Sequence, residues 1–249
     1  KRMSFVRTWE DQVVIPTYPL HPDDINPRFF EVEETLIYPY TMQDHLSRNK
    51  LDRSYRAVFL ENKFLKIMCL PELGGRLHSV YDKQNCQEMF YRNTVIKPGL
   101  IALRGAWISG GVEWNRGPQS HTVTSFSPVD VISTEHEDGS ASIVIGYTEM
   151  NFRTGWEVRL TLYPDKAFLD EKIVLFNPTD HSQTYYFWNN AAFPNTSGTK
   201  FCYPMRAASD HDRFFSWPID QGRDLRWLKN FKDATPVFAY ACDFDFFGL

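Results

Sequence analysis

Residues 156–163 of the chain are Trp156-Glu157-Val158-Arg159-Leu160-Thr161-Leu162-Tyr163, and apolar and polar side chains alternate along them. Successive side chains of a β-strand point to opposite faces, so this alternation predicts a strand with one buried, apolar face. The opposite face either lines a groove, in which Glu157 would meet a ligand, or lies in solvent with Glu157 and Arg159 as an ion pair.

Short segments of the same kind lie on both sides of this strand. They are rich in Val, Ile and aromatic residues, and turn signals such as Gly74-Gly75 and Asn177-Pro178 separate them. These segments are residues 54–60, 64–70, 141–147, 168–176 and 184–188. They predict antiparallel strands in series and an all-β fold, with helix limited to weak patterns in 42–51 and 220–230.

The first forty residues contain five prolines: Pro16, Pro19, Pro22, Pro27 and Pro39. Proline cannot donate to a strand ladder, so we expect residues 1–40 to form an extended arm around the sheets. Residues 41–249 are then one β domain. The aromatic cluster in 243–249 would be awkward as a frayed terminus, which suggests a longer natural protein.

Composition excludes several classes of partner. The 27 basic and 31 acidic residues give a net charge of −4 and leave no basic tract for nucleic acid or anionic lipid. No apolar stretch has the length of a membrane span, and the start lacks the apolar region of a signal peptide. A cytoplasmic location is slightly favoured, with a removed leader as the alternative. The four cysteines lack zinc spacing, so we expect no metal and no cofactor.

Residues 107–121 concentrate the side chains that a sugar site uses. They include Trp107, Trp114, Glu113, Asn115 and His121 around a glycine pair. A sugar has an apolar C–H face and a rim of hydroxyls, so its site needs flat aromatic rings beside groups that donate and accept hydrogen bonds. The alternative is an ordinary turn with solvated polar groups.

Three further motifs connect this segment with a known family. They are residues 70–83 with Gly74-Gly75-Arg76, residues 128–130, and residues 187–194 with Trp188-Asn189-Asn190. In this order the set resembles the family called domain of unknown function 5107, an N-terminal module of bacterial tetratricopeptide-repeat proteins in the galactose-mutarotase-like superfamily. The resemblance implies a β-supersandwich of two large antiparallel sheets with a concave groove, and downstream helical repeats as a partner.

The resemblance also implies roles for individual residues. Mutarotases of this superfamily use a His acid and a Glu base, which makes Glu113 and His121 the catalytic candidates. Where one branch carries a second catalytic His, this chain has Asn189-Asn190. Asparagine cannot exchange a proton near neutral pH, so an aldose mutarotase or epimerase ranks below the broader functions.

The sequence therefore predicts a carbohydrate-active protein that binds a saccharide and acts as a glycoside hydrolase or related sugar-processing enzyme. Glu113 would act as general acid or base beside a second carboxylate, Glu157, Asp210 or Asp212. A non-catalytic binding or scaffolding module for the helical repeats is the alternative. The candidate substrate-binding residues are Arg76, His78, Trp107, Trp114, Asn115, Glu157, Trp188, Asn189 and Asn190.

Overall fold

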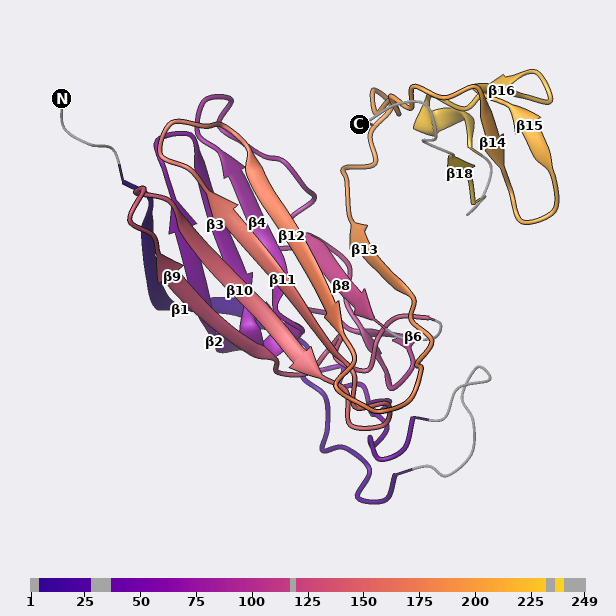
Figure 1. The fold of residues 1–249 in the computed structure, drawn as a ribbon. Helices are drawn as coiled ribbons and strands as arrows, with labels where there is room; N and C mark the ends of the chain where they lie inside the picture. The colour runs from indigo at the N-terminus through magenta and orange to yellow at the C-terminus, as the bar shows by residue number, and fades with distance from the viewer. Residues whose placement is uncertain (1–4, 28–36, 117–119, 232–235, 240–249) are drawn as a thin grey trace. The chain divides into compact units, whose positions relative to one another are not determined.

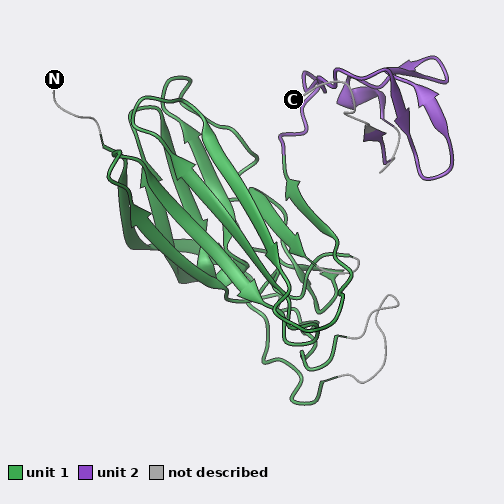
Figure 2. Ribbon diagram, viewed as in Figure 1, with its two compact units in different colours: residues 1–192 green, residues 193–249 purple. Residues whose placement is uncertain are grey.

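The computed structural model describes residues 5–27, 37–116, 120–231 and 236–239. The chain forms two compact units, Lys1–Ala192 and Phe193–Leu249 (Figure 2). This division differs from the expected single domain over 41–249, because the first unit includes part of the expected arm and ends at residue 192.

The first unit is a sandwich of two antiparallel sheets (Figure 1). The larger sheet has the order β1-β2-β3-β4-β8-β13, with β5 paired to β4. Its strands are β1 (Arg7–Thr17), β2 (Leu51–Glu61), β3 (Leu65–Leu70), β4 (Arg76–Asp82), β5 (Gln87–Glu88), β8 (Val112–Arg116) and β13 (Phe187–Ala191). The smaller sheet has the order β12-β11-β10-β9. Its strands are β9 (Asp130–Glu135), β10 (Ala141–Thr148), β11 (Gly155–Leu162) and β12 (Leu169–Phe176).

Two short strands, β6 (Gly99–Ala102) and β7 (Gly105–Trp107), form a separate ribbon, and a 3-10 turn, η1 (Pro71–Leu73), joins β3 to β4. The predicted all-β fold with two large antiparallel sheets is thus confirmed.

The main core lies between the two sheets. On β11, Trp156, Val158, Leu160 and Leu162 are buried in it, as the alternation predicts. They pack with apolar residues of the larger sheet such as Ile67 and Val112. Burial of this extent supplies the main driving force for folding, at roughly 25 cal/mol per Å² of apolar surface.

Two expectations are wrong in the first unit. Residues 7–17 of the expected arm form β1, which pairs with β2 along its whole length. Pro16 is compatible with this ladder because β1 is an edge strand, where a missing N–H is tolerated. The weak helical pattern in 42–51 produces no helix: Met42 packs beside Tyr40 and Leu103, and Leu51 begins β2.

The second unit is small and also β-rich. It contains β14 (Ala207–Ser209), β15 (Phe214–Ser216), β16 (Ile219–Asp220), β17 (Arg223–Asp224), β18 (Phe238–Ala239) and the 3-10 turn η2 (Leu228–Asn230). Its core contains Met205, Ala208, Trp217 and Leu225. The helix expected over 220–230 is reduced to η2, because β16 and β17 take up the start of that segment.

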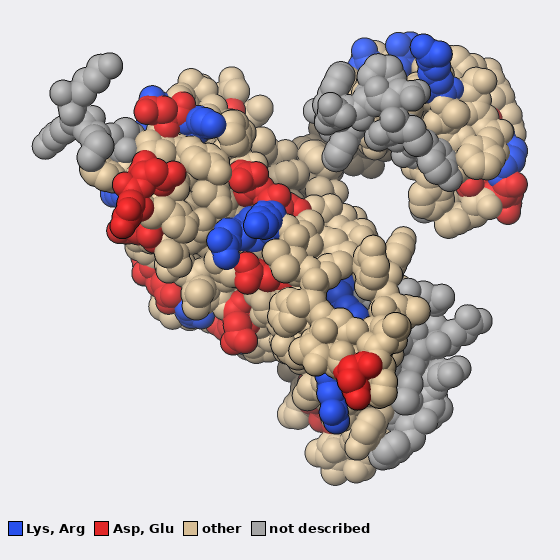
Figure 3. Space-filling view, in the orientation of Figure 1, with Lys and Arg blue, Asp and Glu red and all other residues tan. Residues whose placement is uncertain are grey.

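Charge on the surface is mixed in sign. Figure 3 shows Lys and Arg interspersed with Asp and Glu on the visible face. Within the described residues, no helix has the length and apolar character that crossing a membrane requires.

Candidate functional site

Strand β8 carries the centre of the candidate site. Its register with β13 places Glu113 opposite Asn190 and Asn115 opposite Trp188. Residues paired across an antiparallel ladder share a face, as do residues two apart in a strand. All four side chains therefore lie on one face of the larger sheet, which we call the Glu113 face. The Glu113 face points away from the core between the two sheets, because Val112, the neighbour of Glu113 in β8, is buried in that core.

The carboxylate of Glu113 is buried and held by several donors. It accepts hydrogen bonds from Trp107 Nε1 at 2.8 Å and Ser125 Oγ at 2.7 Å, and His121 Nδ1 lies 3.0 Å from its Oε2. Arg76 Nη2 lies 3.9 Å from the same oxygen. Burial acts to raise the pKa of Glu113, but the His121 hydrogen bond, the Arg76 charge and Ser125 outweigh it and lower the pKa. Glu113 is therefore an ionised carboxylate that orients its neighbours.

His121 is the more accessible member of the pair. Its side chain is 21% exposed, against 4% for that of Glu113. An ionised carboxylate only accepts hydrogen bonds, so the Nδ1 atom of His121 carries a proton. In the neutral ring Nε2 is then an acceptor, and it makes no hydrogen bond to any described residue. His121 can thus present a proton-exchanging nitrogen to a ligand.

Aromatic rings flank the imidazole on two sides. The ring centroids of Trp107 and His121 are 5.2 Å apart, and those of His121 and Trp188 are 6.0 Å apart. Tyr186 extends the cluster, with its ring 4.9 Å from that of Trp188. The sequence predicted Trp107, Trp188 and His121 as site residues, and the fold brings them together from three separate segments.

Arg76 and His78 are buried on β4, the neighbour of strand β8, and of the two only Arg76 reaches the carboxylate of Glu113. The buried guanidinium of Arg76 donates from Nη1 to the carbonyl of Gly110 at 2.6 Å. Burial, followed by the charges of Arg92 and Arg76, lowers the pKa of His78 to about 4, so its ring is neutral at physiological pH. Both side chains were predicted to bind substrate, but their burial makes direct contact with a ligand unfavourable.

The glycine pair before β8 has a backbone role. Gly111 has a φ of 62°, and a Cβ atom there would overlap the carbonyl oxygen of Leu77 on β4. Glycine lets the two strands approach this closely. The glycine pair therefore has the structural role of a turn, which was the alternative to a sugar site for this segment.

Three predicted binding residues point elsewhere. Trp114 is 1% exposed in the core between the sheets and donates from Nε1 to the carbonyl of Gly75 at 3.0 Å. Asn189 shares the face of Trp114, and its amide donates to Glu171 of β12 at 2.8 Å. Glu157 lies on the outer surface of the smaller sheet, 3.1 Å from Arg159. Alternation along β8, β13 and β11 turns these side chains away from the Glu113 face.

Asp210 and Asp212 belong to the second unit. The carboxylate of Asp210 accepts backbone hydrogen bonds from Asp212 at 3.0 Å and Arg213 at 2.9 Å, so it closes a loop. These contacts lower the pKa of Asp210.

One group could offer ligands to a metal ion. Donor atoms of Asp24, Asp44 and His45 lie within 4.8 Å of one another on the first unit. These side chains are at least partly exposed, and exposed acidic groups commonly cluster without an ion.

Two residues of chemical interest were not predicted from the sequence. Ser125 completes the hydrogen bonds of Glu113. Glu149, at the start of the loop between β10 and β11, is buried, and this burial raises its pKa to about 7. Neither residue belongs to a recognisable motif, because each acquires its environment from contacts distant in sequence.

The fold and this cluster define an all-β sandwich protein with a polar and aromatic site on the face of one sheet. Residues 32–246 match the family described as Domain of unknown function (DUF5107), and the chain belongs to this family. The predicted family is therefore confirmed.

A solved structure has a similar fold. It is the crystal structure of a TPR-domain containing protein from Parabacteroides distasonis ATCC 8503, with 25% sequence identity and a TM-score of 0.76. The similarity covers 90% of this chain and 38% of that chain. This chain thus spans well under half the length of that protein.

Proposed function

We propose that the first unit binds a saccharide on the Glu113 face, between Trp107 and Trp188. The observation that carries the proposal is the partly exposed imidazole of His121, flanked by two indoles and anchored by the buried Glu113. Aromatic rings match the C–H faces of a sugar ring, and the imidazole and the Asn190 amide match its hydroxyls.

The anchoring of His121 favours a binding site over a solvated patch. A buried carboxylate with three hydrogen bonds and a nearby guanidinium holds the ring in one orientation. Such pre-organisation lowers the entropic cost of binding a ligand. Solvation of polar side chains alone does not require this arrangement.

If the site is catalytic, His121 is the candidate for proton transfer and Glu113 is its positioning residue. A mutarotase-like reaction is the second candidate: His121 would exchange a proton with either the ring oxygen or the anomeric hydroxyl, and a second acid–base group would have to serve the other oxygen. Glycoside hydrolysis is less favoured, since it uses two carboxylates that flank the scissile bond. Glu157 lies on the opposite outer face of the sandwich, and Glu113 is engaged by its donors.

Helical repeats are the proposed protein partner. The support is the similarity to a TPR-domain containing protein that is much longer than this chain. Saccharide binding and contact with repeats are compatible, because the Glu113 face is only part of the surface of the first unit.

A glycan array probed with the 249-residue chain tests the proposal, followed by calorimetry with the best glycan. We expect Trp188→Ala to weaken binding about tenfold, because a stacking surface is removed. Trp227→Ala, in the second unit, is the matched control and should leave the affinity unchanged. Circular dichroism verifies that both variants fold. An array without binding, or a folded Trp188→Ala variant with unchanged affinity, refutes the proposal.

A further inference from the structure

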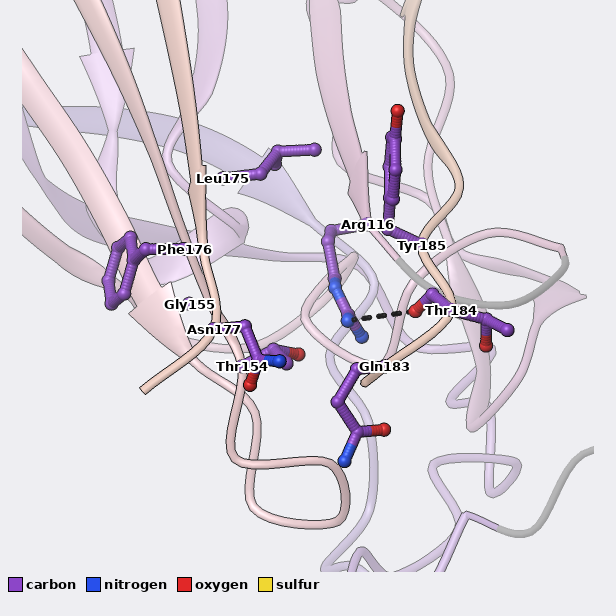
Figure 4. A pocket seen from close by; sticks show the side chains of 9 residues that line it. All are labelled: Arg116, Thr154, Gly155, Leu175, Phe176, Asn177, Gln183, Thr184 and Tyr185. Carbon is purple, nitrogen blue, oxygen red and sulfur yellow. Dashed lines mark hydrogen bonds between the residues drawn. The ribbon is translucent and has the colours of Figure 1, made fainter. Parts of the chain in front are cut away.

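A cavity lies on the side of β8 opposite the Glu113 face. Its volume is about 330 Å³, which is at the small end of the range for ligand pockets. Its lining residues are Arg116, Thr154, Gly155, Leu175, Phe176, Asn177, Gln183, Thr184 and Tyr185 (Figure 4). Arg116 is three positions after Glu113, so strand alternation turns it toward the smaller sheet and away from the Glu113 face.

Arg116 is a buried cation with unused hydrogen-bonding capacity. The residue is 3% exposed, and its guanidinium stacks 5.7 Å from the ring centre of Phe152. A guanidinium has five N–H donors. Among the described residues, the hydrogen bond it makes is a long one, from Nη2 to the carbonyl of Thr184 at 3.5 Å. No described carboxylate lies within ion-pair distance of it, although a buried charge is costly without a partner.

Other donors face the same space. The Thr154 hydroxyl oxygen is buried and has no hydrogen-bond partner among the described residues. Figure 4 shows the Arg116 guanidinium between Thr154 and Asn177 on one side and Gln183 and Thr184 on the other. The Arg116 guanidinium and the unpartnered Thr154 hydroxyl, from separate segments, thus line one volume together with the Gln183 side chain, and the apolar side chain of Leu175 and the ring of Tyr185 line another part of it.

Glu149 is a carboxylate whose charge acts on Arg116. It does not line the cavity, and its Oε1 accepts a long hydrogen bond of 3.5 Å from Thr122 Oγ1. Burial raises the pKa of Glu149 to about 7, so near neutral pH its charge balances that of Arg116 only in part. Burial also lowers the pKa of Arg116, although the charge of Glu149 acts to raise it. The charge of Glu149 therefore does not fully compensate for the lost hydration of the guanidinium.

We propose that this cavity binds a small organic anion, with its carboxylate or phosphate group on Arg116 and its apolar part against Leu175 and Tyr185. A guanidinium fork pairs with both kinds of oxyanion in a bidentate manner. The Thr154 hydroxyl and the Gln183 amide supply further hydrogen bonds. The site is independent of the saccharide proposal, because it lies on the opposite side of β8.

NMR of the full chain with ¹⁵N-labelled arginine tests this proposal directly. Loss of a signal in Arg116→Gln assigns the Arg116 side chain. We expect benzoate or inorganic phosphate to shift that signal in a saturable manner with a millimolar Kd, and benzyl alcohol, the neutral match of benzoate, to leave it unchanged. The tighter of the two anions identifies the oxyanion class. No saturable shift with either anion overturns the proposal.

Two variants with opposite effects make the test decisive. Arg116→Gln should weaken binding of the tighter anion by roughly tenfold or more, because charged hydrogen bonds are lost. Glu149→Gln, at a pH of about 8, should strengthen it about threefold or more by removing the competing negative charge. Glu137→Gln, an exposed carboxylate at the opposite end of β10, is the control and should have no effect. If Arg116→Gln fails to fold, Glu149→Gln decides, and an unchanged affinity in that variant overturns the proposal.

Discussion

The buried Glu149 makes a measurable prediction about the pH dependence of stability. The residue is 3% exposed, and burial holds its pKa at about 7, against 4.5 for a solvated glutamate. Arg116 and the Thr122 hydroxyl act in the opposite direction but do not compensate for the lost hydration. The folded protein therefore binds a proton at Glu149 more tightly than the unfolded chain does.

The sign and size of the effect follow from linkage. Because the folded pKa is the higher one, the stabilising contribution is present below about 4.5 and is lost as the pH rises to about 7 and above. Each tenfold difference in proton affinity is worth about 1.4 kcal/mol, so the full loss is about 3 kcal/mol. Between a pH of about 5 and about 8.5, Glu149 should remove about 2 to 3 kcal/mol from the free energy of unfolding.

Chemical denaturation of Glu149→Gln at both pH values measures this contribution. The uncharged glutamine removes the titration while keeping the size of the side chain. We expect the fall in unfolding free energy from about pH 5 to about pH 8.5 to be about 2 kcal/mol smaller in the variant than in the parent protein. Glu137→Gln, with an exposed carboxylate, should reproduce the parent profile. Parallel pH profiles for parent and Glu149→Gln would refute the inference that Glu149 is buried with a raised pKa.

Three further substitutions test the packing of β8 by urea denaturation. Trp114→Ala should lower the free energy of unfolding by about 3 to 5 kcal/mol, since it empties a large volume in the core. A loss of less than about 1 kcal/mol would instead mean that the indole is exposed. Gly111→Ala should cost more than about 2 kcal/mol because its Cβ meets the Leu77 carbonyl in a left-handed backbone, and a neutral effect would contradict the close approach of β4. Glu113→Gln should cost about 2 to 4 kcal/mol because Arg76 loses its compensating charge, and an unchanged midpoint would show that the two groups are not coupled.

The strands were predictable because their signal is local. Along 156–163 the two-residue period is strict, and the buried apolar residues of β11, from Trp156 to Leu162, follow it. The prediction of an extended arm was wrong for residues 7–17, which form β1, because the number of prolines does not determine whether a segment can pair as a strand. An edge strand tolerates Pro16, and only long-range pairing with β2 reveals that β1 is an edge.

The composition of the Glu113 face was predictable in part. Residues 107–121 supply Trp107, Glu113 and His121, and 187–190 supply Trp188 and Asn190. Which side chains of two paired strands share a face depends on their register. Two adjacent residues of one strand never share a face. Trp114 and Asn189 could have been excluded on that ground, because each is the neighbour of a residue on the Glu113 face. Glu157 could be excluded from the Glu113 face only once it was known that β11 belongs to the smaller sheet.

Alternation along β8 has a further consequence for function. Glu113 and Asn115 face one side and Trp114 and Arg116 the other, so a five-residue strand supplies a pre-organised carboxylate to one surface and a buried cation to the opposite one. The sequence shows both charges within four positions, where they would be read as a simple ion pair. In the folded protein a different opposite charge acts on each: Arg76 on Glu113, and Glu149, only in part, on Arg116. Since the two charges lie on opposite faces of one strand, ligands on the two sides can be tested separately: Trp188→Ala should affect only saccharide binding, and Arg116→Gln only anion binding.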